Sequence, residues 1–154
     1  MNRLCCLLTL VFVLATAALI YLFVIRGEIV PASDGRTAVL MTPGERDLVL
    51  SEMRDFLLAL QTISQAVVDE DTAAAVMAAR RVGGAAQKGV PASLAGKLPL
   101  EFKRLGFDTH SRFDQLALNA EQFGDTSQVL QELATLMQNC TACHAVYRID
   151  PALP

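Results

Sequence analysis

The most apolar part of the chain is its beginning, where no charged residue occurs from residue 4 to residue 25. Arg3 and Arg26 bound this stretch on either side. As a helix it would be about 33 Å long, enough to cross the hydrocarbon core of a bilayer, which is about 30 Å thick. We therefore predict that residues 1–26 form a transmembrane anchor.

A cleaved signal peptide is the alternative for the same segment, because Ala15-Thr16-Ala17 resembles a cleavage site made of small residues. Cleavage there would leave the apolar run 19–25 at the new amino terminus. This consequence favours an anchor that the mature protein retains.

The hydrophobic pattern changes after the anchor, because Pro31, Gly35 and Pro43 interrupt any regular period. No long apolar stripe crosses these residues. We predict an irregular tether over residues 27–42. We expect no β-strand anywhere, since Val, Ile and Tyr do not gather into alternating runs.

From residue 43 onward, apolar residues recur at spacings of four and three, which is typical of helices in a bundle. The pattern predicts helices at 43–68, 72–87, 100–123 and 126–148, with a loop or short broken helix at 88–99. The stripe of the first helix is Val49, Met53, Phe56, Leu60, Ile63 and Val67, and that of the last is Leu133, Met137, Cys140, His144 and Tyr147. The predicted fold is therefore all-α, an antiparallel four-helix bundle over 43–150 with a tail at 151–154.

Local signals mark the ends of two of these helices. Thr42, Pro43 and Glu45 have the order of a capping box with proline in the first turn. Gly124 is placed to end the third helix in a left-handed conformation, and Asp125 to begin the fourth.

Composition and charge narrow the class of protein. The chain has 154 residues and a net charge of −3, which leaves room for one domain of modest size outside the anchor. No basic patch suggests a nucleic-acid partner. Charge therefore argues against polyanions and says little else about partners.

The residues with the clearest chemistry are Cys140-Thr141-Ala142-Cys143-His144. A Cys-x-x-Cys-His run is typical of covalent attachment of a c-type haem. The two thiols can add to the two vinyl groups of one haem, and the histidine is then placed to bind the iron. We therefore predict one haem c, held by Cys140 and Cys143, with His144 as a ligand of the iron.

Other interpretations of the same run explain less. A thioredoxin-like motif needs a βαβ pattern, and a simple disulfide leaves His144 unexplained. A zinc site needs four ligands, and outside the anchor the chain offers only Cys140, Cys143, His144 and His110. Cys5 and Cys6 precede the apolar run, so we interpret them as small apolar residues of the anchor.

Four helices with this motif near the carboxyl end, followed by Tyr147-Arg148, resemble the cytochrome c′ family of class II c-type cytochromes. The resemblance covers roughly residues 43–149. It implies that Cys140 and Cys143 hold the haem and that Arg148 lies over its proximal face and propionates. The alternative for Arg148 is a cation at a helix carboxyl terminus. The resemblance also implies that the protein can form a homodimer.

The function depends on the group that faces the iron opposite His144. Met53 is the first candidate, because it lies on the inward stripe of the first helix. An open site lined by Leu50 is the second, and His110 is the third. With Met53 bound, the protein would transfer single electrons. With an open site, the resemblance implies binding of a diatomic gas, nitric oxide or carbon monoxide.

Catalysis is not expected, because the first helix offers Met, Phe and Leu side chains over the iron and only His110 could act as an acid or base. Attachment of haem to such a motif takes place outside the cytoplasm, as the c-type resemblance implies. We therefore expect a periplasmic haem domain on a single-pass inner-membrane anchor, working with redox partner proteins.

Overall fold

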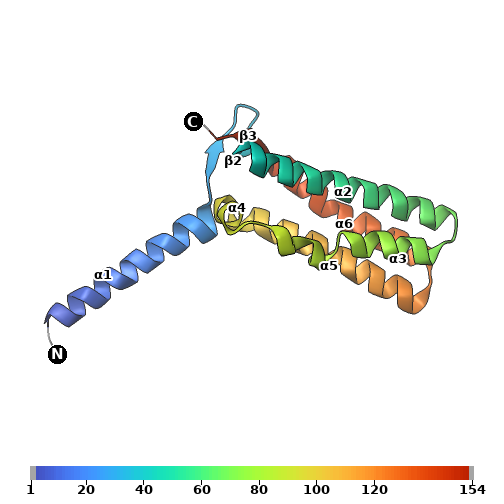
Figure 1. Ribbon diagram of the computed structural model, residues 1–154, viewed down its shortest axis with the longest axis horizontal. Helices are drawn as coiled ribbons and strands as arrows, with labels where there is room; N and C mark the ends of the chain where they lie inside the picture. Colours follow the sequence, from blue (N-terminus) through green and yellow to red (C-terminus); the bar gives the residue numbers. More distant parts are fainter. Residues whose placement is uncertain (1–2, 153–154) are drawn as a thin grey trace.

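The computed structural model describes residues 3–152; residues 1–2 of the predicted anchor and 153–154 of the predicted tail lie outside this range. The chain is mostly helical, with a small sheet between the first helix and the rest of the molecule (Figure 1). The helices are α1 (Arg3–Ile20), η1 (Tyr21–Arg26), α2 (Pro43–Val68), α3 (Thr72–Arg81), η2 (Gly84–Gly89), α4 (Ala92–Lys97), α5 (Leu100–Phe123) and α6 (Thr126–Val146). The strands are β1 (Ile29–Pro31), β2 (Thr37–Met41) and β3 (Tyr147–Pro151).

The predicted apolar helix is present at the amino terminus. α1 continues into the π-helical turn η1, and together they form one helical segment, Arg3–Arg26, that is long and apolar enough to cross a membrane. This segment extends away from the other helices, and its most apolar part is not buried against them (Figure 1).

Two predicted helices are confirmed with their bounds. α2 begins at Pro43, and the Thr42 hydroxyl accepts a hydrogen bond from the Glu45 amide while the Glu45 carboxylate accepts one from the Thr42 amide. This reciprocal pair satisfies two donors that a helix start leaves unpaired. α5 ends before Gly124, whose φ of 63° is left-handed as predicted.

The second predicted helix is shorter than expected. α3 ends at Arg81 instead of Gln87, because the chain comes too close to α5 to continue as a helix. A Cβ atom on Gly83 would lie 1.9 Å from the Asp114 carboxylate, and the Gly84 amide donates to that carboxylate at 2.8 Å. The segment continues as the 3₁₀ turn η2 and then as the short helix α4.

The expectation of an irregular tether without strands was wrong. β1 pairs with β2 in antiparallel fashion, and β2 pairs in parallel with β3, with Thr37 opposite Tyr147 and Met41 opposite Pro151. Ala38, Val39 and Met41 of β2 are fully buried. Most of residues 27–42 therefore belong to the folded domain, and the predicted tail begins within β3.

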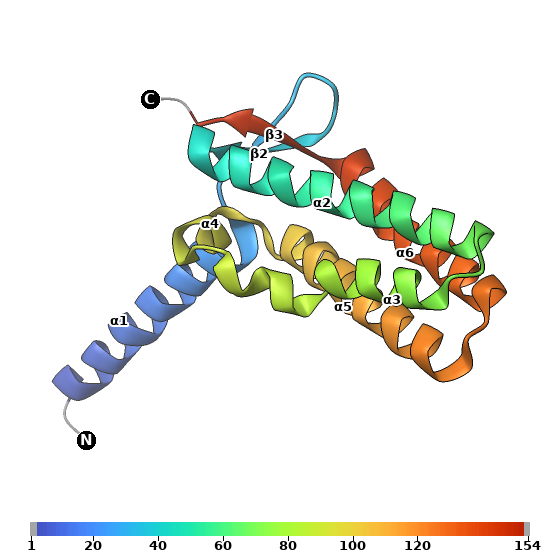
Figure 2. The same ribbon diagram turned by 45° about the vertical axis from the view of Figure 1, so that its right-hand side comes forward.

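Four helices share the larger apolar core. α2 packs on α3 and α6, and α5 packs on the same two helices (Figure 2). The largest side chains of this core are Phe56, Ile63, Phe113, Leu116, Leu133 and Leu136. A second cluster, formed by Val39, Met41, Val49 and Leu94, joins the sheet to the start of α2 and to α4.

Candidate functional site

The Cys-x-x-Cys-His run lies in the last two turns of α6. Cys140 and Cys143 are both half-buried and not disulfide-bonded. They continue the buried face of the helix, which Val129, Leu133 and Leu136 form. The two thiols therefore lie on one side of α6, as attachment to a single group requires.

His144 does not lie on the buried face, contrary to the predicted stripe. Its side chain is exposed, and Met137, one heptad earlier, is 45% exposed. After Leu133 the buried face continues through Leu136 and not through Met137, which places His144 at the edge of that face. The motif thus lies at an edge of the helical domain, with the imidazole accessible.

Burial disfavours the thiolate form of both cysteines. Burial raises the pKa of Cys140, and burial together with the neighbouring Cys140 raises the pKa of Cys143 to about 11. Reactive cysteines of redox motifs have lowered pKa values. The raised pKa values of both thiols therefore differ from those typical of a thioredoxin-like centre. Among residues 3–152, no group of three or more His, Cys, Asp or Glu side chains is placed to hold a metal ion.

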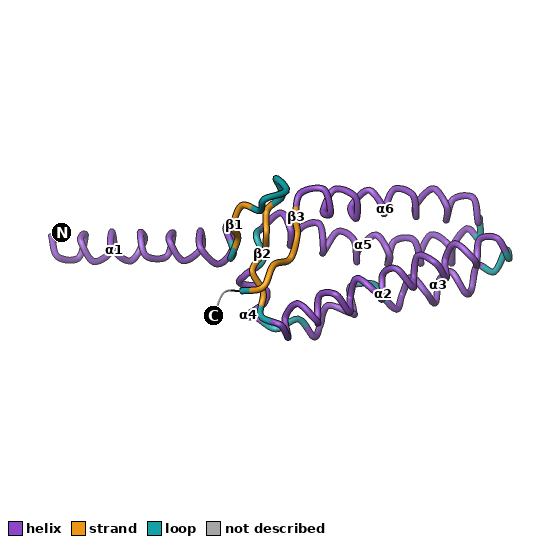
Figure 3. The backbone as a smooth tube through the Cα atoms, turned by 90° about the horizontal axis from the view of Figure 1, so that it is seen from above, coloured by secondary structure: helices purple, strands orange, loops and turns teal. Residues whose placement is uncertain are grey.

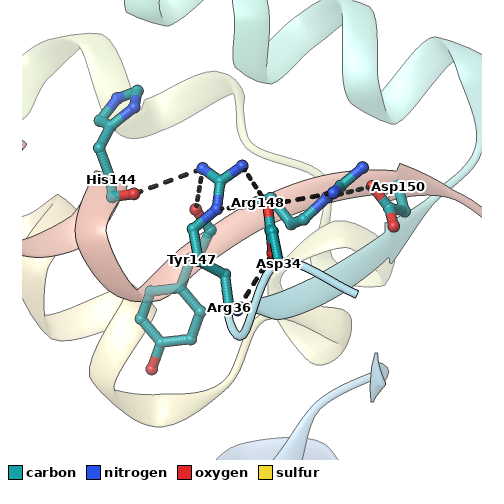
Figure 4. Close-up of polar contacts among 6 residues, drawn as sticks. All are labelled: Asp34, Arg36, His144, Tyr147, Arg148 and Asp150. Carbon is teal, nitrogen blue, oxygen red and sulfur yellow. Dashed lines mark hydrogen bonds and ion pairs between the residues drawn. The ribbon is translucent and has the colours of Figure 1, made fainter. Parts of the chain in front are cut away.

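Arg148 is not one helical turn beyond His144, because α6 ends at Val146 and Arg148 lies in β3. Its guanidinium donates to Asp150 at 2.8 Å and to Asp34 at 3.2 Å (Figure 4). These two carboxylates raise the pKa of Arg148, with the hydrogen bond to Asp150 as the larger cause. Arg148 is therefore engaged in the sheet, on a strand that directly follows the helix.

Arg36, a residue of the supposed tether, lies against the end of α6. Its guanidinium donates to the backbone carbonyls of His144 and Tyr147, each at 3.4 Å, and to Asp34 at 2.7 and 2.9 Å (Figure 4). The hydrogen bonds from Arg36 lower the pKa of Asp34 to about 2. Sequence reasoning missed Arg36, since only the pairing of β2 with β3 brings it to the motif.

A second contact holds α6 immediately before the motif. The Asn139 side chain donates to the Asp108 carboxylate of α5 at 2.7 Å and lies 3.4 Å from the Thr109 hydroxyl. Hydrogen bonds from Arg112 and then Asn139 lower the pKa of Asp108. The last turns of α6 are thus tied to α5 on one side and to the β1–β2 loop at the end.

Met53 is half-buried on α2 and packs against both apolar clusters. The second of these clusters also contacts Tyr147 and Ile149, so this edge of α2 turns toward the end of α6. Leu50, the alternative lining residue, is half-buried one turn earlier.

His110 is buried, not on the surface of its helix. Its Nδ1 lies 2.7 Å from the Val82 carbonyl and its Nε2 lies 3.1 Å from Glu52, while its ring centroid is 4.8 Å from that of Phe56. Burial disfavours the charged form, but the hydrogen bonds to Glu52 and Val82 outweigh it and raise the pKa of His110. Both ring nitrogens are engaged, so His110 could bind a metal only by giving up one of these bonds.

Exposed apolar side chains lie on α2 and α6, the helices that carry Met53 and the motif. α2 and α6 lie apart at the end next to the sheet, where β2 and β3 run between them (Figure 3). Leu57, one turn beyond Met53, is 67% exposed, and Met137 is also exposed. A large apolar group attached through Cys140 and Cys143 would cover exposed apolar surface of α6 such as Met137, one turn before Cys140, and gain its burial energy.

Comparisons with known proteins give no relative for this chain: no family model, no curated protein and no solved structure matches it.

Proposed function

We propose that this protein is a membrane-anchored c-type cytochrome that carries one covalent haem and transfers single electrons. The observation that carries the proposal is the Cys-x-x-Cys-His run on α6, with both thiols half-buried on one side of the helix and His144 accessible beside them. A bound haem would supply one reversibly transferred electron through its iron.

We propose further that the helical domain is a four-helix bundle of the cytochrome c′ type. The packing of α2, α3, α5 and α6 around a common core supports this, as does the position of the motif in the last helix. The β-sheet and the early end of α6 depart from the pattern that the resemblance implied.

In this proposal Cys140 and Cys143 hold the haem through thioether bonds and His144 binds the iron. Met53 is the candidate for the opposite side, because it packs against the same apolar cluster as Tyr147, the residue that follows α6. We assign Arg148 to the structure and not to the haem propionates, since two carboxylates already neutralise it.

The anchor supports a location at the membrane surface. η1 and the residues just after it are docked on the domain: the Lys103 ammonium donates to the Phe23 carbonyl of η1 at 3.4 Å, and beyond η1 the Glu28 amide donates to the Lys97 carbonyl at 2.7 Å. The motif lies at the same end of the domain as the anchor (Figure 1). A haem there would be near membrane-bound redox partners, on the periplasmic side if the anchor orients as proposed.

The test is haem retention after extraction with acidified acetone, which removes haem that is not covalently bound. Wild type should keep its haem, and Cys140→Ala with Cys143→Ala should lose it. Cys5→Ala with Cys6→Ala is the matched control and should behave as wild type, because these cysteines lie in the anchor. Wild-type protein that releases its haem, or contains none, would refute the c-type assignment.

Binding of a diatomic gas is the second candidate, and the packing of Met53 favours it. Met53 already contacts both apolar clusters, so turning it to an iron would uncover part of the core. Absorption spectra of the reduced protein with and without carbon monoxide distinguish the two functions. A spectrum that ignores the gas in wild type and responds in Met53→Ala supports electron transfer, with Met77→Ala, on an exposed residue, as the control.

A further inference from the structure

We propose that Arg36, held in place by Asp34, is a positioning residue for the iron ligand His144, because it fixes the last turn of α6 from the β1–β2 loop. The inference rests on the proposed haem function. It adds a residue outside the motif and outside the helices that the resemblance covers.

The end of α6 creates a specific need for a donor. Helices leave their last carbonyls without partners inside the helix. In α6 the Tyr147 amide donates to the Cys143 carbonyl, and then the chain turns into β3. The next carbonyl, that of His144, has no amide of the helix left to accept from, and Arg36 Nη1 supplies the donor for it and for the Tyr147 carbonyl.

Charge favours the same contact. The carboxyl end of a helix carries partial negative charge, which a guanidinium stabilises. Arg36 is kept there by the Asp34 carboxylate, which accepts from its Nε and Nη2, while its backbone amide also donates to Asp34. Arg148 donates to the same carboxylate and to Asp150, so two guanidinium groups and two carboxylates form a balanced cluster (Figure 4).

The contact acts on the ligand through the backbone. Only Ala145 and Val146 follow His144 in the helix, so unwinding of one turn would release the His144 backbone. The imidazole itself points away from the Arg36 guanidinium (Figure 4) and is left accessible. Arg36 therefore sets the direction of the imidazole without occupying the side where an iron would bind.

The experiment uses the full-length protein with three variants and one control. Arg36→Gln removes the charge, Arg36→Lys keeps the charge without the planar fork, and Asp34→Asn weakens the support for Arg36. Arg54→Gln is the control, because Arg54 is exposed in the middle of α2. The first measurement is hydrogen exchange of the Tyr147 amide, which reports the last turn of α6 directly.

We expect Arg36→Gln to speed exchange of the Tyr147 amide by about 2- to 5-fold, since loss of a cation at a solvent-accessible helix end changes the opening equilibrium by such a factor. Asp34→Asn and Arg36→Lys should give smaller increases, and Arg54→Gln none. The second measurement is the electron paramagnetic resonance spectrum of the ferric haem. In Arg36→Gln, the signal of the histidine-ligated iron should broaden or split into more than one species.

Two results would overturn the inference, and they can be told apart. In the first, all variants carry covalent haem, and Arg36→Gln matches the Arg54→Gln control in the exchange rate of the Tyr147 amide and in the electron paramagnetic resonance spectrum. This result would refute the role of Arg36 and leave the proposed haem function intact. Wild type without covalent haem would refute the proposed function and, with it, any role of Arg36 toward an iron ligand.

Discussion

Replacement of Met41 by alanine distinguishes a folded β1–β2 segment from a tether. Met41 is fully buried and contributes to the cluster with Val39, Val49 and Leu94. Truncation of a buried methionine to alanine costs about 2 to 5 kcal/mol, the lost burial plus the cavity left behind. In an irregular tether the same change would cost almost nothing. The expected decrease in the free energy of unfolding is therefore far larger than the uncertainty of an unfolding experiment.

The assay is urea and thermal unfolding of the full-length protein in detergent micelles, followed by circular dichroism. Met77→Ala is the matched control, because Met77 is 66% exposed on α3. For a domain of this size, 1 kcal/mol shifts Tm by about 3 to 6 °C, so Met41→Ala should lower Tm by more than about 6 °C. If Met41→Ala destabilises no more than Met77→Ala, β2 is not part of the cooperative fold and the description of the sheet is wrong.

Two further predictions concern the interior and the junction with the anchor. The raised pKa of His110 depends partly on Glu52. The contribution of this pair to stability is therefore complete below the pKa of His110 in the unfolded chain, about 6.5, and is lost as pH rises through the pKa of His110 in the folded protein. Glu52→Gln should therefore destabilise more at about pH 5.5 than at about pH 8.5 in urea unfolding; equal losses would contradict this. Gly27→Ala should also destabilise, since Gly27 has a φ of +67° and an added Cβ would lie 2.3 Å from the Lys97 carbonyl. Gly106→Ala is the control: no atom lies within 4 Å of the added Cβ, so this change should stabilise the protein by about 1 kcal/mol. A Gly27→Ala variant as stable as Gly106→Ala would mean that η1 is not docked.

The parts of the fold that the sequence predicted well are those that local interactions determine. The capping box at Thr42 and the glycine at 124 act within a few residues of themselves, and the periodic stripes of α2 and α5 are long. α3 shows the limit of such signals. Its early end depends on Asp114, a residue of α5 that is distant in sequence and comes too close to Gly83 for a side chain to fit.

The sheet could not be predicted from a pattern in one segment. β2 is a short apolar run that does not alternate, and its partner β3 follows α6, with all four core helices between them. Parallel pairing over such a distance leaves no local signal, unlike a hairpin with a short turn. The lack of a local signal for β3 also explains the wrong expectation for Arg148. We expected this residue in the last helix, and it lies in β3.

In the candidate site, too, residue types follow from local sequence, whereas side-chain orientation depends on tertiary contacts. Cys140, Cys143 and His144 could be proposed as site residues because the chemistry of such a run depends on residue type and spacing, both of which are local. The direction of His144 depends on how α6 is rotated and on what holds its end, and both are tertiary properties. Arg36 reaches that end only because β2 pairs with β3. A segment with the composition of a linker thus connects the anchor to the motif, so a change in the β1–β2 loop should loosen the backbone at His144 before it alters the rest of the helices.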